Sequence, residues 1–303
     1  MPQFEWRGLA KEIITSRYPH FLRLARLDKP VGSFLLLWPT LSALWLASQG
    51  WPGWHLLLVF TLGTCLTRSA GCVINDIADR KFDGSVKRTM DRPIPSGDVK
   101  VSEALFFMIL LCLLALLLVI TTNFNTILLA FLGATLAGIY PYMKRFTHMP
   151  QIILGIAFSF GIPMAFTAVS NDVSRVTGLL FIANLIWIVS YDTIYAMVDR
   201  DDDLKLGLKS SAILFGDLDK FMIGILQISF LASLLLVWKT ANLHWPFLIG
   251  ILIAIIILSY QQLLIKDRKR DLCFRAFLIS HWLGLILFLS IVVDLFFYTE
   301  GAT

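Results

Sequence analysis

The sequence predicts an all-α fold, a polytopic membrane bundle of about nine transmembrane helices. Three observations predict this class. The chain of 303 residues is 57% hydrophobic and only 16% charged, whereas a soluble domain carries about 25% charge. Apolar runs long enough to cross a bilayer stand end to end, and basic residues gather in alternate loops. We expect a single domain over residues 1–303.

Nine apolar runs have the length of a membrane-spanning helix, which needs roughly 20 residues. They cover about 31–49, 54–74, 103–122, 124–142, 150–170, 177–198, 221–238, 245–264 and 275–297. Two of the intervening segments are longer than a turn, about 75–102 and about 199–220. Both begin with acidic residues directly after a span, so we expect the active-site loops there.

Basic residues provide an independent test of the span count, because cytoplasmic loops are enriched in Lys and Arg. One set of alternate segments contains Arg7, Lys11, Arg17, Arg23, Arg26, Lys29, Arg80, Lys81, Lys87, Arg88, Arg92, Lys100, Lys144, Arg145, Arg200, Lys205, Lys209, Lys220, Lys266, Arg268, Lys269, Arg270 and Arg275. The opposite set contains only Arg175 and Lys239. The pattern predicts a cytoplasmic N-terminus and an outside C-terminus. We interpret the net charge of +5 as attraction to anionic lipid and not to nucleic acid.

The first acidic motif follows the second span. Asn75, Asp79 and Asp83 have the spacing i, i+4, i+8, which places three oxygen-bearing side chains on one face of a continuing helix. Asp76 lies beside Asn75 on an adjacent face. The second motif follows the sixth span, where Asp199 and Asp203 repeat the i, i+4 spacing.

Clustered carboxylates of this kind repel one another, and burying them at a membrane edge costs further free energy. Bound cations would compensate them. Mg²⁺ takes oxygen ligands and is commonly held by one or two carboxylates together with substrate phosphates. Two carboxylate faces that oppose each other across a bundle could therefore hold Mg²⁺ ions that bridge a diphosphate. The alternative is that the acidic residues form ordinary solvated loops.

Arg68 and Asp192 lie inside the two spans that lead to the acidic motifs, where charge is expensive and usually functional. Arg68 precedes Asn75 by two turns on about the same face, and Asp192 precedes Asp199 by two turns. No CxxC or similar spacing joins the four cysteines, so neither a zinc site nor a disulfide framework is supported.

At these residues the sequence resembles the UbiA superfamily of intramembrane aromatic prenyltransferases. The motif NDxxDxxxD of that family stands here as NDIADRKFD, and its DxxxD motif stands as DRDDD. The blocks RLDKPVGSFLLLWPT, YPYMKRFTHMPQ and YDTIYAMVDRDDDLKLGLKSSAILFG extend the likeness over about 26–216. They are most similar to the bacterial branch that acts on 4-hydroxybenzoate in ubiquinone biosynthesis, in the cell inner membrane.

The resemblance implies that the nine helices surround a central cavity. It also implies a transferase with two substrates, a polyprenyl diphosphate and 4-hydroxybenzoate, and with Mg²⁺ as cofactor. We assign Asn75, Asp76, Asp79, Asp83, Asp199 and Asp203 to the Mg²⁺ ions and Arg68, Lys87, Arg88, Arg92 and Lys209 to the diphosphate. The allylic cation needs aromatic faces, and the acid needs a guanidinium or ammonium group. Arg145, Lys144 and Tyr195 are the candidates around the aromatic acid, with Arg68 as an alternative. Asp192 could orient the phenol or accept a proton.

Two other classes stay open at this point. Intramembrane charge also marks the ion path of a transporter or channel, although here the acidic residues gather at one membrane face. Within the superfamily, the acceptor could be another quinone precursor, haem or chlorophyll. The prenyl chain length does not follow from the sequence.

Overall fold

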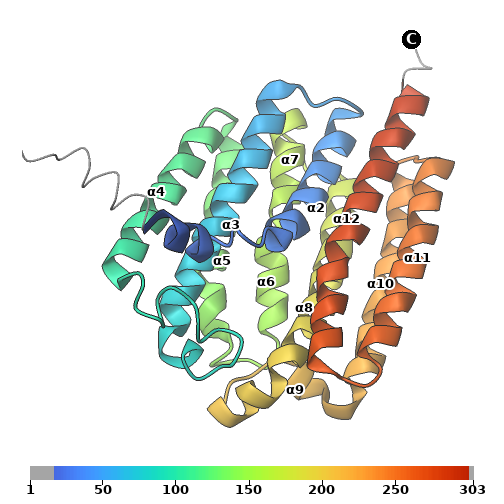
Figure 1. Cartoon of the computed structure of the whole chain (residues 1–303). Coiled ribbons are helices and arrows are strands. Elements are labelled where there is room, and N and C mark those ends of the chain that lie inside the picture. The colour runs from blue at the N-terminus through green and yellow to red at the C-terminus, as the bar shows by residue number, and fades with distance from the viewer. Residues whose placement is uncertain (1–16, 300–303) are drawn as a thin grey trace, which may run out of the picture.

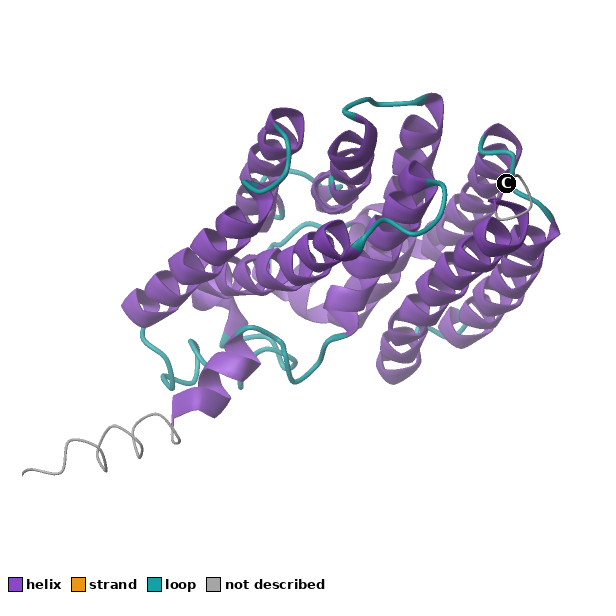
Figure 2. Cartoon of the chain, turned by 90° about the horizontal axis from the view of Figure 1, so that it is seen from above, coloured by secondary structure: helices purple, strands orange, loops and turns teal. Residues whose placement is uncertain are grey.

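The computed structural model describes residues 17–299. Within that range, nine helical segments are long and apolar enough to cross a membrane. They pass up and down through one bundle (Figure 1), and from above the described chain consists of helices and connecting loops (Figure 2). The predicted fold class and the nine predicted spans are confirmed. Arg7 and Lys11, two of the basic residues used to orient the chain, lie outside the described residues.

Eleven α-helices make up these segments in the described range. They are α2 (Val31–Ser48), α3 (Trp54–Asp83), α4 (Val101–Val119), α5 (Phe124–Met143), α6 (Pro150–Ser159), α7 (Gly161–Ser170), α8 (Arg175–Leu206), α9 (Ser211–Phe215), α10 (Asp219–Thr240), α11 (Trp245–Ile265) and α12 (Arg270–Thr299). Helices α6 and α7 together form the fifth span, and α9 leads through one 3₁₀ turn into α10.

Local sequence accounts for where several helices begin and end. The side chains of Asn123 and Ser174 accept hydrogen bonds from the backbone N–H of residues three positions on and so cap α5 and α8. Pro150 stands in the first turn of α6, where a missing N–H costs nothing. Gly207 adopts a left-handed conformation with φ of 68° and ends α8.

Helix α8 is the most buried helix of the bundle. It packs against α2, α6, α7, α10 and α12, and from residue 187 to residue 199 every side chain except Tyr195 is buried. Trp187 stacks on Phe230 of α10 at 5.9 Å and contributes to the main hydrophobic core. The long acidic helix is therefore surrounded by protein over most of its length.

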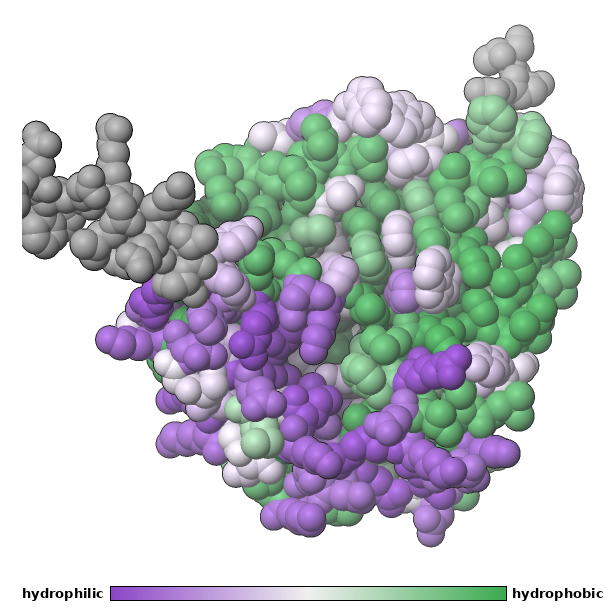
Figure 3. Space-filling view, in the orientation of Figure 1, coloured by the Kyte–Doolittle hydropathy of each residue, from purple (hydrophilic) through white to green (hydrophobic). Residues whose placement is uncertain are grey.

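Both acidic motifs lie at the same end of the bundle, which we call the acidic end; the opposite end is the far end. Helices α3 and α8 both run toward the acidic end, at the bottom of Figure 1. Hydrophilic residues gather over this end, whereas apolar residues cover most of the remaining visible face (Figure 3). This distribution matches a bundle that spans the bilayer and reaches a membrane–water interface at each end. Which end faces the cytoplasm stays a prediction.

A glycine permits the close approach of α7 to α2. A Cβ on Gly161 would collide with the hydroxyl of Thr40, which donates a hydrogen bond to the carbonyl of Leu36 at 2.8 Å. A Cβ on Gly178 of α8 would meet nothing within 4 Å.

We expect Gly161→Ala to destabilise the protein by about 1–3 kcal/mol, because overpacking displaces the Thr40 hydroxyl. Gly178→Ala is the matched control and should be neutral or stabilising by up to about 1 kcal/mol, since alanine is the better helix former. Thermal unfolding of the full chain in detergent measures both. A shift of both variants in the same direction would contradict the close packing of α7 on α2.

Candidate active site

The two acidic motifs stand on helices and not in loops. Helix α3 continues past its apolar part to Asp83, and α8 continues to Leu206. The expected loops at about 75–102 and 199–220 are thus helical at their beginnings, and the irregular part of the first is confined to residues 84–100. Asn75, Asp79 and Asp83 share one face of α3, as the spacing predicts.

Two arginines hold the inner carboxylates of the first motif. Asp76 is only 1% exposed and accepts hydrogen bonds from Arg26 at 2.9 and 3.0 Å and from Arg92 at 2.9 Å. The same Arg92 nitrogen donates to Asp83 at 2.8 Å. Because a buried carboxylate requires a partner, this network joins the segment before α2, the end of α3 and the loop at 84–100.

A third arginine holds the second motif. Arg88 donates hydrogen bonds to both oxygens of Asp199 at 2.6 to 3.1 Å, and its guanidinium lies 4.8 Å from the ring centre of Tyr195. Burial opposes charge on Arg88, but Tyr195, Asp199 and Asp83 outweigh that effect and raise its pKa above the ordinary value. Arg88 is therefore a permanent cation that links the loop after α3 to α8.

Lys144 stands between the two motifs. Its ammonium group acts electrostatically on Asp79 of α3 and on Asp192, Asp199 and Asp203 of α8. One cation within range of four carboxylates from two helices shows that the motifs face a common region. The structure thus brings together residues that are more than a hundred positions apart in the chain.

Arg145 and Lys209 border the same region. Arg145 donates to the carbonyl of Ala78 at 2.8 Å and lies 3.9 Å from the Asp79 carboxylate. Lys209 donates through its backbone N–H to the carbonyl of Lys144 at 3.0 Å and through its ammonium to the carbonyl of Phe146 at 3.3 Å. The loop after α8 is in this way tied to the loop after α5.

Arg68 lies deeper in the bundle. Its guanidinium is 5.5 Å from the ring centre of Phe158, and a Cβ on Gly32 would stand 2.6 Å from it, so the glycine makes room for it. Arg68 acts electrostatically on Asp192 and Tyr191. Among the described residues, the buried Arg68 Nε and the Tyr191 hydroxyl have no hydrogen-bond partner. Buried polar groups normally have one, so a bound polar group would complete this region.

Whether these residues can hold Mg²⁺ depends on which of their side-chain oxygens have no hydrogen-bond or ion-pair partner in the described chain. Within residues 17–299, the side chains of Asn75 and Asp203 make no hydrogen bond or ion pair, and Asp79 has only the long contact to Arg145. Asp203 is nevertheless 4% exposed. In the same range, no three His, Cys, Asp or Glu side chains converge into a complete metal site. This donor set fits an ion that takes part of its shell from phosphate oxygens and water, as Mg²⁺ does.

One predicted residue pairs with none of these carboxylates within the described chain, and two residues that support the site were not predicted. Lys87 is exposed and has no ion pair within the described chain. Sequence reasoning missed Arg26 as the partner of Asp76, and it missed Asp219, which is fully buried and accepts hydrogen bonds from Arg268 at 2.8 to 3.1 Å. The signal that could have identified Arg26 was its position shortly before the first predicted span. Asp219 carried no such signal in the sequence.

The Asp219 pair belongs to a lock on the end of α8. Arg200 of α8 lies 3.8 Å from Asp219, and Asp202 of α8 accepts a hydrogen bond from Arg270 at 3.1 Å. Residues 200 and 202 flank the face that carries Asp199 and Asp203. The last three helices thereby fix the second motif, although they contain no recognisable motif themselves.

Residues 36–299 match the UbiA prenyltransferase family. The chain belongs to this family, and its fold and acidic motifs are those of a membrane prenyltransferase. It is 54% identical over 274 residues to the 4-hydroxybenzoate octaprenyltransferase of Enterobacter sp. (strain 638), covering 90% of this chain and 95% of that protein. It is 52% identical over 281 residues to the enzyme of the same name from Tolumonas auensis, covering 93% of this chain and 98% of the relative.

Solved structures share the fold at low identity. A UbiA homolog from Aeropyrum pernix K1 superposes with a TM-score of 0.77 at 21% identity, covering 86% of this chain and 97% of that chain. A UbiA homolog from Archaeoglobus fulgidus, bound to GPP and Mg²⁺, has a TM-score of 0.68 at 17% identity, with coverage of 90% and 99%. The predicted family and helical architecture are confirmed; the role of each site residue stays a prediction.

The pairing of the carboxylates predicts different outcomes for two aspartates. Asp76→Ala leaves Arg26 and Arg92 without their shared anion, and we expect a loss of about 3 kcal/mol in the free energy of unfolding. Asp203→Ala removes a carboxylate that no described cation contacts within 4 Å, so the melting temperature should hardly change while activity is lost. Equal melting temperatures for the two variants would contradict this division of roles.

Proposed function

We propose that the protein transfers a polyprenyl group from a polyprenyl diphosphate to the ring carbon ortho to the hydroxyl of 4-hydroxybenzoate, with Mg²⁺, in ubiquinone biosynthesis. The observation that carries the proposal is the gathering of Asp79, Asp199 and Asp203 around Lys144 at one end of a prenyltransferase fold. The identity of more than half of all aligned residues with 4-hydroxybenzoate octaprenyltransferases supports the choice of acceptor.

Asn75, Asp79 and Asp203 are the side chains best placed to hold Mg²⁺, because their oxygens accept no hydrogen bond within the described chain and Asp79 has only the 3.9 Å contact with Arg145. Asp83 and Asp199 complete the proposed set once Arg92 and Arg88 turn to phosphate oxygens, and Asp76 would act behind them through Arg92. Mg²⁺, when bound, would offset the charge that develops on the departing diphosphate. Arg68, Lys87 and Lys209 are the remaining proposed phosphate ligands.

The reaction breaks the C–O bond between the allylic carbon and the diphosphate, and the electron pair leaves with the diphosphate. Arg88 and Arg92, once they have turned to the phosphate oxygens, stabilise the charge on that leaving group. Tyr195 lies 4.5 Å from Phe277 between ring centres and carries Arg88 on one side. These rings offer π faces to the allylic cation and keep water away from it.

The second half of the reaction takes place on 4-hydroxybenzoate, the acceptor. Its ring carbon forms the new C–C bond, and the proton on that carbon then leaves so that the ring regains its aromaticity. Asp192, buried within electrostatic range of Arg68 and Lys144, is the proposed proton acceptor or phenol ligand. Arg145 is the proposed ligand of the carboxylate, because its guanidinium can donate two parallel hydrogen bonds, with Lys144 beside it.

Nine apolar spans make this an integral membrane protein, and we propose the bacterial inner membrane with the acidic end in the cytoplasm. The positive-inside rule supports that orientation, since Lys87, Lys144 and Lys209 stand at the acidic end. Another acceptor within the family is the second candidate. Membership of a prenyltransferase family argues against a transporter.

Purified protein in liposomes, given 4-hydroxybenzoate, a long-chain prenyl diphosphate and Mg²⁺, should form the prenylated acid. EDTA should abolish the product. Asp79→Ala and Asp199→Ala should each lower kcat at least about 100-fold, because charge stabilisation in the transition state is lost. Product is measured by chromatography and mass spectrometry.

Asp172→Ala is the matched control, since Asp172 is an exposed carboxylate in the far-end loop between α7 and α8. Full activity of either acidic-motif variant would refute the site. Diphosphate release with other aromatic acceptors but not with 4-hydroxybenzoate would preserve the reaction class and exclude this acceptor.

Arg145→Gln should raise the KM for 4-hydroxybenzoate about tenfold or more and leave the KM for the prenyl diphosphate nearly unchanged. The reason is the loss of a charge-assisted hydrogen bond, which contributes about 1.5–3 kcal/mol. Lys266→Gln, which removes an exposed cation at the same end, is the control. A larger rise in the KM for the diphosphate would move Arg145 to the diphosphate instead.

A further inference from the structure

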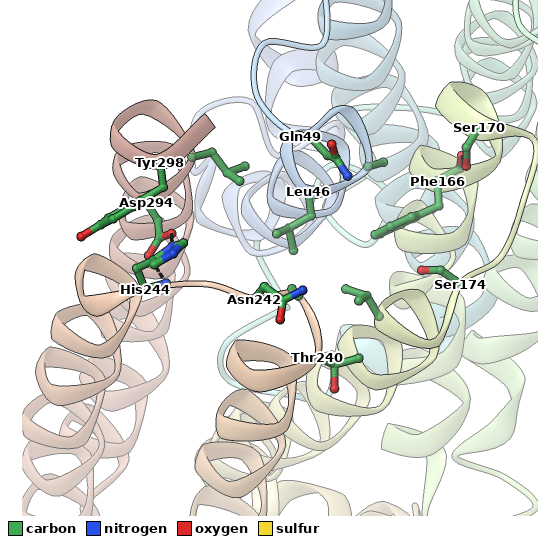
Figure 4. A pocket seen from close by; sticks show the side chains of 14 residues that line it. Leu46, Gln49, Phe166, Ser170, Ser174, Thr240, Asn242, His244, Asp294 and Tyr298 are labelled. Carbon is green, nitrogen blue, oxygen red and sulfur yellow. Dashed lines mark hydrogen bonds and ion pairs between the residues drawn. The ribbon is translucent and has the colours of Figure 1, made fainter. Parts of the chain in front are cut away.

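A second concave site lies at the far end, away from the acidic motifs. A pocket of about 510 Å³ opens there between the ends of α2, α7, α8, α10, α11 and α12. Its volume lies within the usual range for small-molecule sites, about 300–1,000 Å³. Figure 4 shows that Leu46 and Phe166 line one part of it and that His244, Asp294 and Tyr298 stand together on the other side. The prenyl-transfer mechanism uses none of these residues.

A buried carboxylate organises one wall of the pocket. Asp294 of α12 is 1% exposed, and its Oδ2 accepts hydrogen bonds from the backbone N–H of His244 at 2.8 Å and of Phe247 at 3.2 Å. It therefore caps the beginning of α11 from another helix. A carboxylate this deep in a membrane protein points to function by default, and here it sets the position of a histidine.

The same carboxylate orients the imidazole. His244 Nδ1 lies 3.2 Å from Asp294 Oδ1, and since an ionised carboxylate only accepts, Nδ1 must donate. In the neutral ring, Nε2 is then an acceptor, and within the described chain it has no hydrogen-bond partner. The ring stacks on Tyr298 with 3.7 Å between centres, which holds its plane. The pocket thus presents a fixed acceptor to a hydroxyl group.

The remaining polar lining is uncharged. Amides and hydroxyls come from Gln49, Ser170, Ser174, Thr240 and Asn242, and no Lys or Arg among residues 17–299 lines the pocket. A phosphate or carboxylate would find no cation there, and the one carboxylate present is already satisfied by its three donors. The chemistry selects a neutral ligand that has hydroxyl or carbonyl oxygens and an apolar body for Leu46, Phe166 and Val176.

The pocket also lies at the depth where amphipathic rings accumulate. Trp238 and Trp245 flank the connection that carries His244, and the Trp238 indole donates to the carbonyl of His244 at 3.2 Å. Tryptophans at span ends mark the interface between bilayer and water. A ligand that reaches this depth from the membrane has an apolar tail and a modestly polar ring.

We propose that the far-end pocket binds the ring of a lipid-soluble hydroquinone, with one ring hydroxyl donating to His244 Nε2. The site is separate from prenyl transfer, so the proposal does not depend on the reaction at the acidic end. A hydroxybenzoate is excluded as the occupant by the missing cation. The ligand class is a tail-bearing aromatic without a carboxylate.

The test is calorimetric titration of the full chain in nanodiscs with a decyl-tailed 1,4-hydroquinone, with empty nanodiscs subtracted. We expect saturable binding to the wild type. His244→Phe, which keeps a stacking ring and removes the acceptor, should weaken binding about tenfold, the effect of losing one hydrogen bond. His55→Phe is the matched control because His55 also stands at the far end, outside the pocket, and it should bind as the wild type does.

Two further arms separate the sites and guard against misfolding. Asp199→Ala should bind the hydroquinone normally, which excludes occupancy of the acidic end. The dimethyl ether of the same hydroquinone should bind the wild type about tenfold more weakly, since it cannot donate to Nε2; this arm decides the matter even if His244→Phe does not fold. Equal affinity for the ether, equal affinity of a folded His244→Phe, or no saturable binding overturns the proposal.

Discussion

The need to compensate carboxylates that are buried at a membrane edge governs the architecture of the acidic end. Six acidic side chains from α3 and α8 gather there, and an unpaired charge in such surroundings would be strongly destabilising. The chain compensates them with basic side chains from outside both helices: Arg26 before α2, Arg88 and Arg92 in the loop after α3, and Lys144 after α5. The segment before α2, the part of α3 near its end and the loop after it share a small apolar cluster that includes Leu24, Val73 and Val99, and the ion pairs join their polar side chains. The site is therefore assembled by charge, on a scaffold assembled by apolar packing.

The burial of α8 explains how one helix can serve both the apolar core and the charged site. Packed on several sides by other helices, α8 could not present Asp199 and Asp203 to solvent without leaving the core. It instead extends beyond the apolar layer, so that its deep part contributes Trp187 to the core and its end contributes carboxylates to the site. Arg200 and Asp202, on either side of the acidic face, bond to the last helices and prevent the extended end from fraying.

Much of this could be predicted from the sequence, because the signals concerned are periodic or compositional. Apolar length located all nine spans, and the i, i+4 spacing placed Asn75, Asp79 and Asp83 on one helical face. Spacing along one helix carries no information about a partner fifty or a hundred residues away, so the pairs Arg26–Asp76 and Arg88–Asp199 were out of reach. Asp219 and Asp294 were missed for the same reason, although an acidic residue inside the last span was a signal for Asp294. The individual roles of the site residues remain predictions.

The lock formed by Asp219, Arg268 and Arg270 affects the order in which the site forms during biosynthesis. Chains emerge from the ribosome with the N-terminal part first, so α3 and α8 enter the membrane before the loop between α11 and α12 exists. Arg200 can pair with Asp219 as soon as α10 has been made, but until that loop and the start of α12 arrive, Asp202 has no Arg270 to bond. The nascent chain therefore completes its second acidic motif only when its last hairpin has been inserted. A chain whose synthesis stops halfway therefore stays in the membrane with an incomplete site and is not an uncontrolled catalyst.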